Sequence, residues 1–204
     1  MSSPDRSTGV PPAWHARLAE QLGAVRRDAG LAAACQRGRN LEPLDELKMT
    51  GPIVYVLEGD DHTPDQEHVP SWQREAVLGA VHHTLTLYAC HQQSQTPSMH
   101  QRGITLGEAA RRLQTAMPSK DGAYTRFRAA RGADSLPELI GHLRGLVSLL
   151  RTYTIPLDYV ALADALASWE QPQRRAWLRR RWGLDFTHTP KSTQITSTDA
   201  PPSA

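Results

Sequence analysis

The sequence contains only two cysteines, Cys35 and Cys90, and they do not form a Cys-x-x-Cys pair. A disulfide framework, or a zinc site built from paired cysteines, is therefore excluded. Both cysteines lie in Ala-rich or apolar segments with helical periodicity, where a free cysteine is usually a small buried side chain. We therefore predict two reduced, inert thiols.

Long apolar segments are also missing. No run of about 18 apolar residues could span a bilayer, and the first residues, MSSPDRSTGV, lack the apolar core of a secretion signal. We therefore predict a cytoplasmic globular protein that does not bind membranes. Its 204 residues suit one domain, or two small packed halves, with enough chain to bury a core.

Motifs of catalytic sites are absent. There is no Gly-x-Ser-x-Gly elbow and no Walker loop, and the GITLG segment at 103–107 lacks the lysine that a phosphate loop needs. The histidines between residues 82 and 100 do not have zinc-ligand spacing, and the acidic stretch 60–68 lacks the residue order of a calcium loop. We expect His82 and His83 to be ordinary helix residues, one facing polar neighbours and one facing solvent. The sequence predicts no catalytic residue, no metal and no cofactor.

The net charge is only +2, but the charges are unevenly distributed. Residues 40–75 hold nine acidic and two basic residues, whereas residues 101–183 hold thirteen arginines and one lysine against seven acidic residues. Arginine suits bidentate contacts with phosphate groups. The pattern predicts an acidic segment followed by a basic half.

Apolar residues at spacings of three and four, with capping signals, predict helices that begin near Pro12, Leu31, Ser71, Thr105, Tyr124, Ser135, Pro156 and Pro172. Residues 41–70 lose this periodicity and contain four prolines, so we predict mostly loop there, with a short apolar run at 53–57 that fits a strand or a buried helical turn. The predicted fold is all-α, a compact bundle of about seven or eight helices over residues 12–186, with disordered tails at 1–11 and 187–204.

The segment Ser135–Arg151 has the strongest helix signals. Ser135 and Glu138 form a capping-box pattern, and Pro137 stands in the first turn, where a missing N–H costs nothing. One broad face of this helix is apolar, and Arg144 and Arg151 share an edge of that face. An arginine at such an edge can lay its methylenes on apolar surface and hold its guanidinium outward. The segment therefore predicts a basic, anion-binding flank.

Arginines recur at the edges of the apolar faces of at least four consecutive predicted helices. A solvated, salt-bridged surface explains any single arginine equally well, but the whole set favours binding to a nucleic-acid backbone. Trp14, Trp72 and Trp169 lie on apolar faces and are expected to be buried, so we predict no base-stacking platform. We expect Arg111 and Arg112 to be solvent-exposed. The candidate nucleic-acid-binding residues are Arg102, Arg111, Arg112, Lys120, Arg126, Arg128, Arg131, Arg144, Arg151, Arg174, Arg175, Arg179, Arg180 and Arg181.

Five motifs occur in an order that resembles a known family. They are HTLTLYACHQQS (83–94), MHQRGITLGEAARRL (99–113), RFRAARGADSLPELIGHLRGLVSLLR (126–151), IPLDYVALADAL (155–166) and RRRWGLDF (179–186). Together they resemble the small subunit of the type I-E CRISPR surveillance complex Cascade, the CasB family. The resemblance covers about residues 72–186 and is less clear for 1–70, and Leu184 stands where the family commonly has an arginine.

The resemblance implies an all-helical, non-enzymatic scaffold subunit that is present as two copies stacked head to tail. It also implies neighbours of the CasC backbone type and the CasA large-subunit type. In that family, basic surfaces of the small subunit help to hold the guide RNA–target DNA region and the displaced non-target strand. The candidate arginines of the motifs, Arg111, Arg144 and Arg151 among them, would perform this role here.

Two other interpretations stay open from the residues alone. The first is a protein–protein adaptor whose arginines pair with acidic surfaces of neighbouring subunits, such as residues 40–75 of an adjacent copy. The second is a stand-alone transcription factor, but the sequence has no clear helix-turn-helix signature with a polar face for reading bases.

Overall fold

The computed structural model describes residues 11–64 and 67–188. The tails predicted to be disordered, 1–11 and 187–204, lie outside the described residues except for Pro11, Thr187 and His188. Within the described ranges the chain folds into nine α-helices and forms no strand. The all-α class is thus confirmed, with nine helices in place of the predicted seven or eight.

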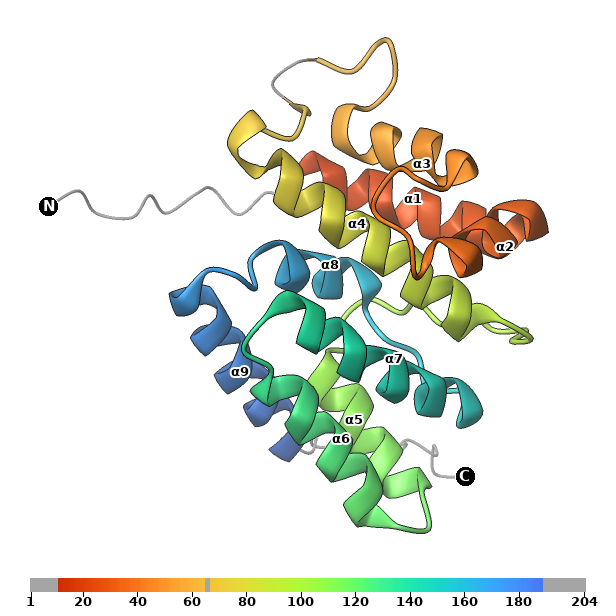
Figure 1. Cartoon of the computed structure of the whole chain (residues 1–204). Helices are drawn as coiled ribbons and strands as arrows, with labels where there is room; N and C mark the ends of the chain where they lie inside the picture. The colour runs from red at the N-terminus through yellow and green to blue at the C-terminus, as the bar shows by residue number, and fades with distance from the viewer. Residues whose placement is uncertain (1–10, 65–66, 189–204) are drawn as a thin grey trace, which may run out of the picture.

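The helices in chain order are α1 (Ala13–Arg27), α2 (Ala29–Gly38), α3 (Leu47–Glu58), α4 (Ser71–Gln92), α5 (Leu106–Ala116), α6 (Lys120–Gly132), α7 (Leu136–Thr152), α8 (Tyr159–Ala167) and α9 (Pro172–Thr187) (Figure 1). The last of them begins at Pro172, as predicted, and ends at Thr187. In the described parts of the chain, no helix has the length and apolar character that crossing a bilayer requires.

Helix α4 joins the two halves of the molecule. It contacts α1, α2 and α3 on one side and α7 and α8 on the other, while α5, α6 and α9 pack at the far end (Figure 1). Its side chains are buried around much of its circumference, including Val81, Leu85 and Tyr88. Helix α4 is therefore the central helix of the fold.

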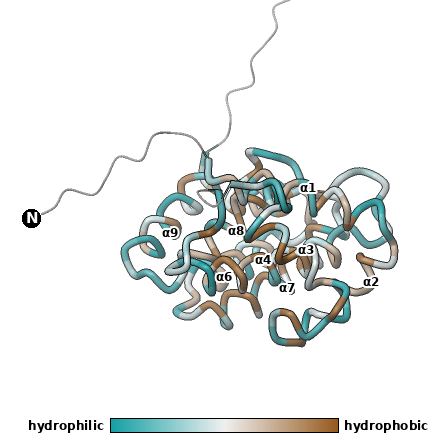
Figure 2. The backbone as a smooth tube through the Cα atoms, turned by 90° about the horizontal axis from the view of Figure 1, so that it is seen from above, coloured by the Kyte–Doolittle hydropathy of each residue, from teal (hydrophilic) through white to brown (hydrophobic). Residues whose placement is uncertain are grey.

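One continuous hydrophobic core runs through the molecule and includes residues of every helix. Along each helix the residue hydropathy alternates between polar and apolar, as expected for helices with one buried face (Figure 2). Cys35 is buried and Cys90 half-buried, and both are free thiols, as predicted. Burial raises the pKa of the Cys35 thiol to about 12, so the thiolate form is strongly disfavoured there.

The prediction for residues 41–70 missed the helix α3, although the buried helical turn offered for 53–57 is present and the rest of the described segment forms no α-helix. Pro52 is inside this helix, where proline removes a backbone hydrogen bond. Ile53 and Val56 are completely buried against the neighbouring helices, and this burial outweighs the local cost. The buried Arg17 of α1 also donates from Nε to the carbonyl of Val56 at 3.0 Å, which satisfies the C-terminal end of α3.

Helix α8 begins at Tyr159, whereas the sequence predicted a start near Pro156. Asp158 is its N-cap, and the residues before it pair with the loop that precedes α5. His100 and Leu157 form an isolated parallel bridge, and the Leu157 amide donates to the Met99 carbonyl at 3.0 Å. The two loops are therefore held together at the start of α5 and α8.

The predicted caps of two helices are present. Ser135 Oγ accepts a hydrogen bond from the Glu138 amide at 3.3 Å, and Glu138 Oε2 accepts one from the Asp134 amide at 2.8 Å, one residue before the predicted donor. Thr105 Oγ1 likewise accepts from the Glu108 amide at 3.3 Å. Both sequence signatures thus mark true helix starts.

Three predictions of exposure were wrong. Trp72 is 76% exposed, because it lies in the first turn of α4, beyond the edge of the core. His82 is buried and His83 is half-buried, because α4 is covered on several sides, so neither faces open solvent. Arg111 and Arg112 of α5 are half-buried.

Candidate nucleic-acid interface

A groove lies between α4 and α7, on the flank that carries Arg144 and Arg151. It has a volume of about 250 Å³ and is lined by Arg39, Thr86, Leu87, Cys90, Gln93, Arg144, Val147, Ser148 and Arg151. Three of these residues are arginines and none is acidic. Arg39 is the C-cap of α2 and lies 105 positions before Arg144 in the sequence. We call this feature the α4–α7 groove.

Two arginines of the α4–α7 groove, Arg144 and Arg151, are held by neutral acceptors. Arg151 donates from Nη1 to Gln93 Oε1 at 2.8 Å and to the Cys90 carbonyl at 3.3 Å. Arg144 donates from Nη2 to the Arg39 carbonyl. Because no carboxylate takes part, these bonds fix the guanidinium groups without cancelling their charge. Preorganised, uncompensated cations are what a phosphate backbone requires.

The neighbouring histidine adds no charge to this groove at neutral pH. Burial is the main reason why the pKa of His83 is lowered to about 4, and the nearby His82 and Arg144 lower it further. The pKa of His82 is also lowered, mainly by burial. The positive potential of the groove therefore comes from its arginines.

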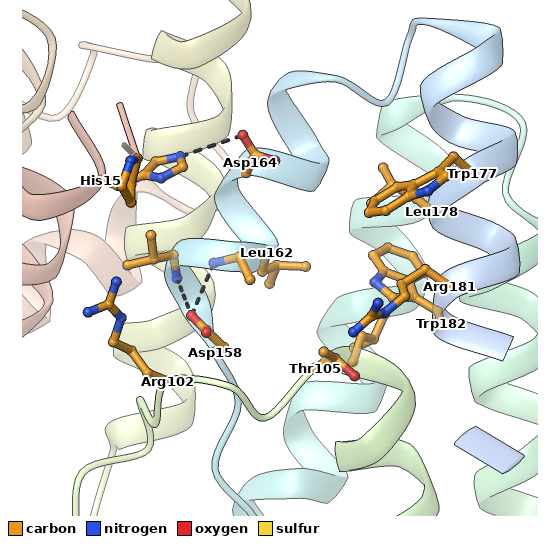
Figure 3. Close-up of a pocket in the computed structure, with 14 residues that line it drawn as sticks. His15, Arg102, Thr105, Asp158, Leu162, Asp164, Trp177, Leu178, Arg181 and Trp182 are labelled. Carbon is orange, nitrogen blue, oxygen red and sulfur yellow. Dashed lines mark hydrogen bonds and ion pairs between the residues drawn. The ribbon is translucent and has the colours of Figure 1, made fainter. Parts of the chain in front are cut away.

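A second candidate site, lined by two arginines and two aspartates, lies between α8 and α9 (Figure 3). This α8–α9 pocket has a volume of about 460 Å³, and its lining includes Arg102, Asp158, Trp177 and Arg181. The pairing of the loops before α5 and α8 sets Arg102 beside Asp158, since the Gly103 amide donates to Asp158 Oδ2 at 2.8 Å. Gly103 has a φ of +84°, a conformation that glycine adopts without strain.

Two candidate arginines of α9 point into the molecule. Arg179 donates from Nη2 to the carbonyls of Gly132 and Ala133, at 2.9 and 2.6 Å, and to Asp134 Oδ1 at 2.9 Å. Arg175 donates from Nη1 to the Asp134 carbonyl at 2.6 Å. These bonds tie the C-terminal end of α6 to α9, so both guanidinium groups have a structural task.

The two candidate arginines of α5 differ in their surroundings. Arg112 is in an ion pair with Glu108, with 2.6 Å between Nη2 and Oε1. The Nε atom of Arg111 is buried and has no hydrogen-bond partner among the described residues. Arg131 of α6 lies against Gly183 of α9, because a Cβ atom built at Gly183 would be 2.3 Å from Arg131 Nη1.

The remaining candidates are exposed and scattered over α6 and α9. Arg126 donates to the Gly122 carbonyl at 3.2 Å. Arg174 is 3.8 Å from Asp164 in an ion pair and lies over the ring of Trp177. Among these remaining candidates, Lys120, Arg128 and Arg180 have side chains without a polar partner in the described part of the chain. The candidate residues therefore do not form one continuous track on the monomer, and their binding roles stay predictions.

Sequence reasoning did not include two residues that the structure brings to these sites. Arg39 lies outside the basic segment 101–183, and only the tertiary fold shows that it lies beside Arg144. Trp177 is 47% exposed and lies between the arginines of α9. An aromatic residue within a basic helix is a signal for nucleic-acid binding that could have been noticed in the sequence.

No group of three metal-ligating side chains forms among residues 11–64 and 67–188. His91 is completely buried on α4, with 2.9 Å between its Nδ1 and the hydroxyl of Tyr159. His100 Nδ1 accepts a hydrogen bond from the Tyr159 amide at 3.1 Å. These histidines therefore have structural partners.

Comparisons with known proteins agree with this arrangement. The family model described as CRISPR-associated protein Cse2 matches residues 31–186. The chain belongs to the Cse2 family. Among solved structures, this Cse2 chain is similar to CasB from Thermobifida fusca, at 33% sequence identity and a TM-score of 0.64. The match covers 85% of this chain and 94% of that one. A comparison with curated proteins finds no match.

The family resemblance that the motifs indicate is thus confirmed, and the Cse2 match extends it from about residue 72 back to residue 31. The matched range contains all three arginines of the α4–α7 groove. It also contains the acidic segment 40–75, so this segment belongs to the Cse2 domain.

Proposed function

We propose that this chain is the non-catalytic small subunit of a type I-E Cascade complex, and that it binds the backbone of nucleic acid without sequence specificity. The family membership supports the place in a CRISPR complex. The α4–α7 groove supports the mode of binding, because two of its three arginines, Arg144 and Arg151, are held by neutral acceptors and its lining contains no carboxylate.

The proposed effect is to stabilise an R-loop. Exchange of a DNA duplex for a guide RNA–target DNA duplex is nearly balanced in free energy, so a few additional contacts decide whether the opened state persists. Each phosphate contact of an arginine contributes on the order of 1 kcal/mol in this reasoning. Contacts of the groove with the guide RNA–target DNA region or with the displaced non-target strand would therefore slow reclosing.

The proposed partners follow from the family. They are a second copy of this chain stacked head to tail, a CasC-type backbone subunit, a CasA-type large subunit, the guide RNA and both DNA strands. In this assembly base pairing reads the sequence, and the small subunit has no need to contact base edges.

The test is a reconstituted complex that carries Arg144→Ala and Arg151→Ala. Arg74→Ala is the matched control, because Arg74 pairs with Glu58 outside the groove. We expect the double variant to assemble normally and to lose target binding when the salt concentration is raised, while the control behaves as the unmodified complex. Unchanged target binding of the double variant across the salt series would contradict the proposal.

A specific observation favours a second candidate, a protein–protein adaptor. The segment between α2 and α3 exposes three leucines, with exposed fractions of 42% for Leu41, 37% for Leu44 and 84% for Leu47. Leu44 also has a φ of 77°, a strained conformation for a residue other than glycine. Exposed Glu42 and Asp45 lie among these leucines. Such a surface suits an apolar partner patch with a basic rim.

A further inference from the structure

We propose that the α8–α9 pocket is a docking site for one unstacked base of a single-stranded nucleic acid, with Arg102 and Arg181 on the adjacent phosphates. This inference rests on the proposed function for the kind of ligand. It goes beyond that function because it adds a base contact, which the α4–α7 groove does not offer, at a separate place in the fold.

The floor of the pocket is aromatic and apolar. Trp177 is 47% exposed, whereas Leu178 and Trp182 beside it are buried (Figure 3). Trp182 stacks on Trp169 with a distance of 5.3 Å between the ring centroids and an angle of 19° between the planes, which fixes the floor. The exposed indole of Trp177 is therefore a rigid surface on which the face of a base can stack.

The orientation of Trp177 is also constrained. The guanidinium carbon of Arg174 is 5.4 Å from the centroid of the Trp177 ring, in a cation–π arrangement. This contact places a third cation beside the pocket. A stacking surface flanked by arginines is typical of sites that bind single strands irrespective of sequence.

Both carboxylates near the pocket have partners within the protein, so neither is a free anion that would repel a phosphate group. Asp158 is buried and accepts hydrogen bonds from the amides of Gly103 at 2.8 Å and of Val160 and Ala161 at 3.1 Å. Asp164 is in an ion pair with Arg174 at 3.8 Å, and it lies 3.5 Å from His15, which carries a positive charge only when it is protonated.

The two arginines of the rim differ in their partners. Arg102 is exposed and has no hydrogen bond or ion pair with the described residues. Arg181 forms an ion pair with Asp185 through Nε at 3.2 Å, so its charge is partly neutralised, but its Nη groups have no partner among the described residues and can contact a phosphate oxygen. Figure 3 shows Arg102 and Arg181 on opposite sides of the open part of the pocket.

The size of the pocket fits this ligand. A volume of about 460 Å³ is within the range of sites for small organic ligands and exceeds what one base requires. Exposed tryptophan and arginine are also typical of protein interfaces, so a partner protein is the competing occupant. The unpaired guanidinium of Arg102 and the free Nη groups of Arg181 favour the anionic ligand.

The test compares a labelled single-stranded oligonucleotide of thymidines with an abasic strand of the same length, each bound to the full chain at fixed salt. The variant Trp177→Ala removes the stacking surface, and Trp177→Phe keeps an aromatic ring there. Trp72→Ala is the matched control, because Trp72 is 76% exposed and does not line the pocket.

We expect the unmodified chain to bind the strand with bases at least about 5-fold more tightly than the abasic strand, as stacking of one base predicts. Trp177→Ala should abolish this difference, whereas Trp177→Phe and Trp72→Ala should keep most of it. Affinity for the abasic strand should be the same for all four proteins, which shows that the variants are folded.

Equal affinity of the unmodified chain for the two strands would overturn the pocket assignment while leaving backbone binding intact. A base preference that survives in Trp177→Ala would overturn it as well. If Trp177→Ala weakened assembly with the other subunits and left the base preference unchanged, the occupant would be a protein. If the chain bound neither strand, the proposed function itself would be contradicted. This outcome differs from equal binding of the two strands, which contradicts only the pocket assignment.

Discussion

Arg151 Nη1 donates a hydrogen bond to Gln93 Oε1 at 2.8 Å, and this bond joins the last turn of α7 to the C-cap of α4. Gln93 accepts the bond without carrying a charge, so the guanidinium is oriented and its positive charge stays available. Arg151 differs in this respect from Arg112, which is in an ion pair with the carboxylate of Glu108. An arginine with a neutral partner can bind phosphate, whereas an arginine in a local ion pair is already partly neutralised.

The first prediction changes the charge of this partner. Gln93→Glu keeps the size of the side chain but gives Arg151 a carboxylate partner. We expect single-stranded DNA to bind about 3- to 10-fold more weakly at low salt, since one phosphate contact on the order of 1 kcal/mol is weakened. Fluorescence anisotropy with a labelled oligonucleotide measures the effect.

Gln21→Glu on α1 is the control for net charge, because Gln21 lies outside the groove. It should leave the affinity within about 2-fold of the unmodified chain, as expected for a single surface charge in salt. Equal losses in both variants would mean that net charge, and not the partner of Arg151, governs binding.

The second prediction concerns the packing of α5 on α9. A Cβ atom at Gly107 would be 2.1 Å from the Trp182 carbonyl oxygen, and a backbone atom cannot rotate away. We expect Gly107→Ala to lower the free energy of unfolding by about 1–3 kcal/mol, as overpacking usually does. Urea denaturation followed by circular dichroism measures the change.

The control is Gly141→Ala in α7. No atom lies within 4 Å of a Cβ built at Gly141, and the position is exposed and helical. Alanine should therefore stabilise the protein by about 0.5–1 kcal/mol, because it has the higher helix propensity. A loss of stability at Gly141 or a gain at Gly107 would contradict the packing described for α5 and α9.

The third prediction concerns acid stability. Burial lowers the pKa of both His83 and His91 to about 4 in the folded protein, whereas an unfolded histidine has a pKa near about 6.5. Between these values the unfolded chain binds more protons, so the free energy of unfolding falls as the pH falls from about 6.5 towards 4. Above about pH 6.5 the contribution of these histidines to stability is complete.

The variant His83→Leu tests this assignment, because Nδ1 of His83 is buried without a polar partner. Thermal unfolding followed between about pH 7 and pH 4 should show a shallower loss for this variant, by at most about 1.4 kcal/mol per pH unit for one histidine. His62→Leu, at an exposed position, should leave the slope unchanged. An identical slope in the unmodified chain and in His83→Leu would refute the role of His83.

The fourth prediction tests the adaptor surface between α2 and α3. Leu47 is the first residue of α3, so Leu47→Asp adds an acid where the helix dipole favours it and should not destabilise the fold. If the leucines contact a partner protein, assembly with the other subunits should weaken at least about 5-fold, as for a residue important to an interface. Native gel titration of the complex measures this.

Binding of Leu47→Asp to single-stranded DNA should stay within about 2-fold of the unmodified chain, because the α4–α7 groove is untouched. Leu184→Asp is the control, since Leu184 is 66% exposed but lies on α9. Normal assembly of Leu47→Asp would remove the support for the adaptor function.

The sequence allowed most of the fold to be predicted, because periodicity and caps agree in most helices. The start of α7 at Ser135 and the start of α5 at Thr105 were both visible as local patterns. Helix α3 was not visible in this way. Pro52 and the acidic residues around it suggest a loop, and only the burial of Ile53 in the folded protein shows why a helix forms there. That burial depends on long-range packing, which includes the hydrogen bond of Arg17 to α3.

The candidate site was predictable only in part. Helical spacing alone indicated that Arg144 and Arg151 share one edge of a helix, and both line the α4–α7 groove. Composition could not separate these arginines from Arg179, whose partners are the Gly132 and Ala133 carbonyls 47 and 46 residues away. Whether an arginine is free for a ligand depends on which carbonyl or carboxylate the tertiary fold brings to it.

The most direct test of backbone binding by the α4–α7 groove is a salt series with labelled single-stranded DNA of several sequences and the purified full chain. We predict equal affinities for all sequences and a linear fall of log K with log salt, with a slope of about −2 for three phosphate contacts. In Arg144→Ala with Arg151→Ala the slope should be reduced by about 1.4. Sequence-dependent affinity, or a double variant with the salt slope of the unmodified chain, would contradict this account.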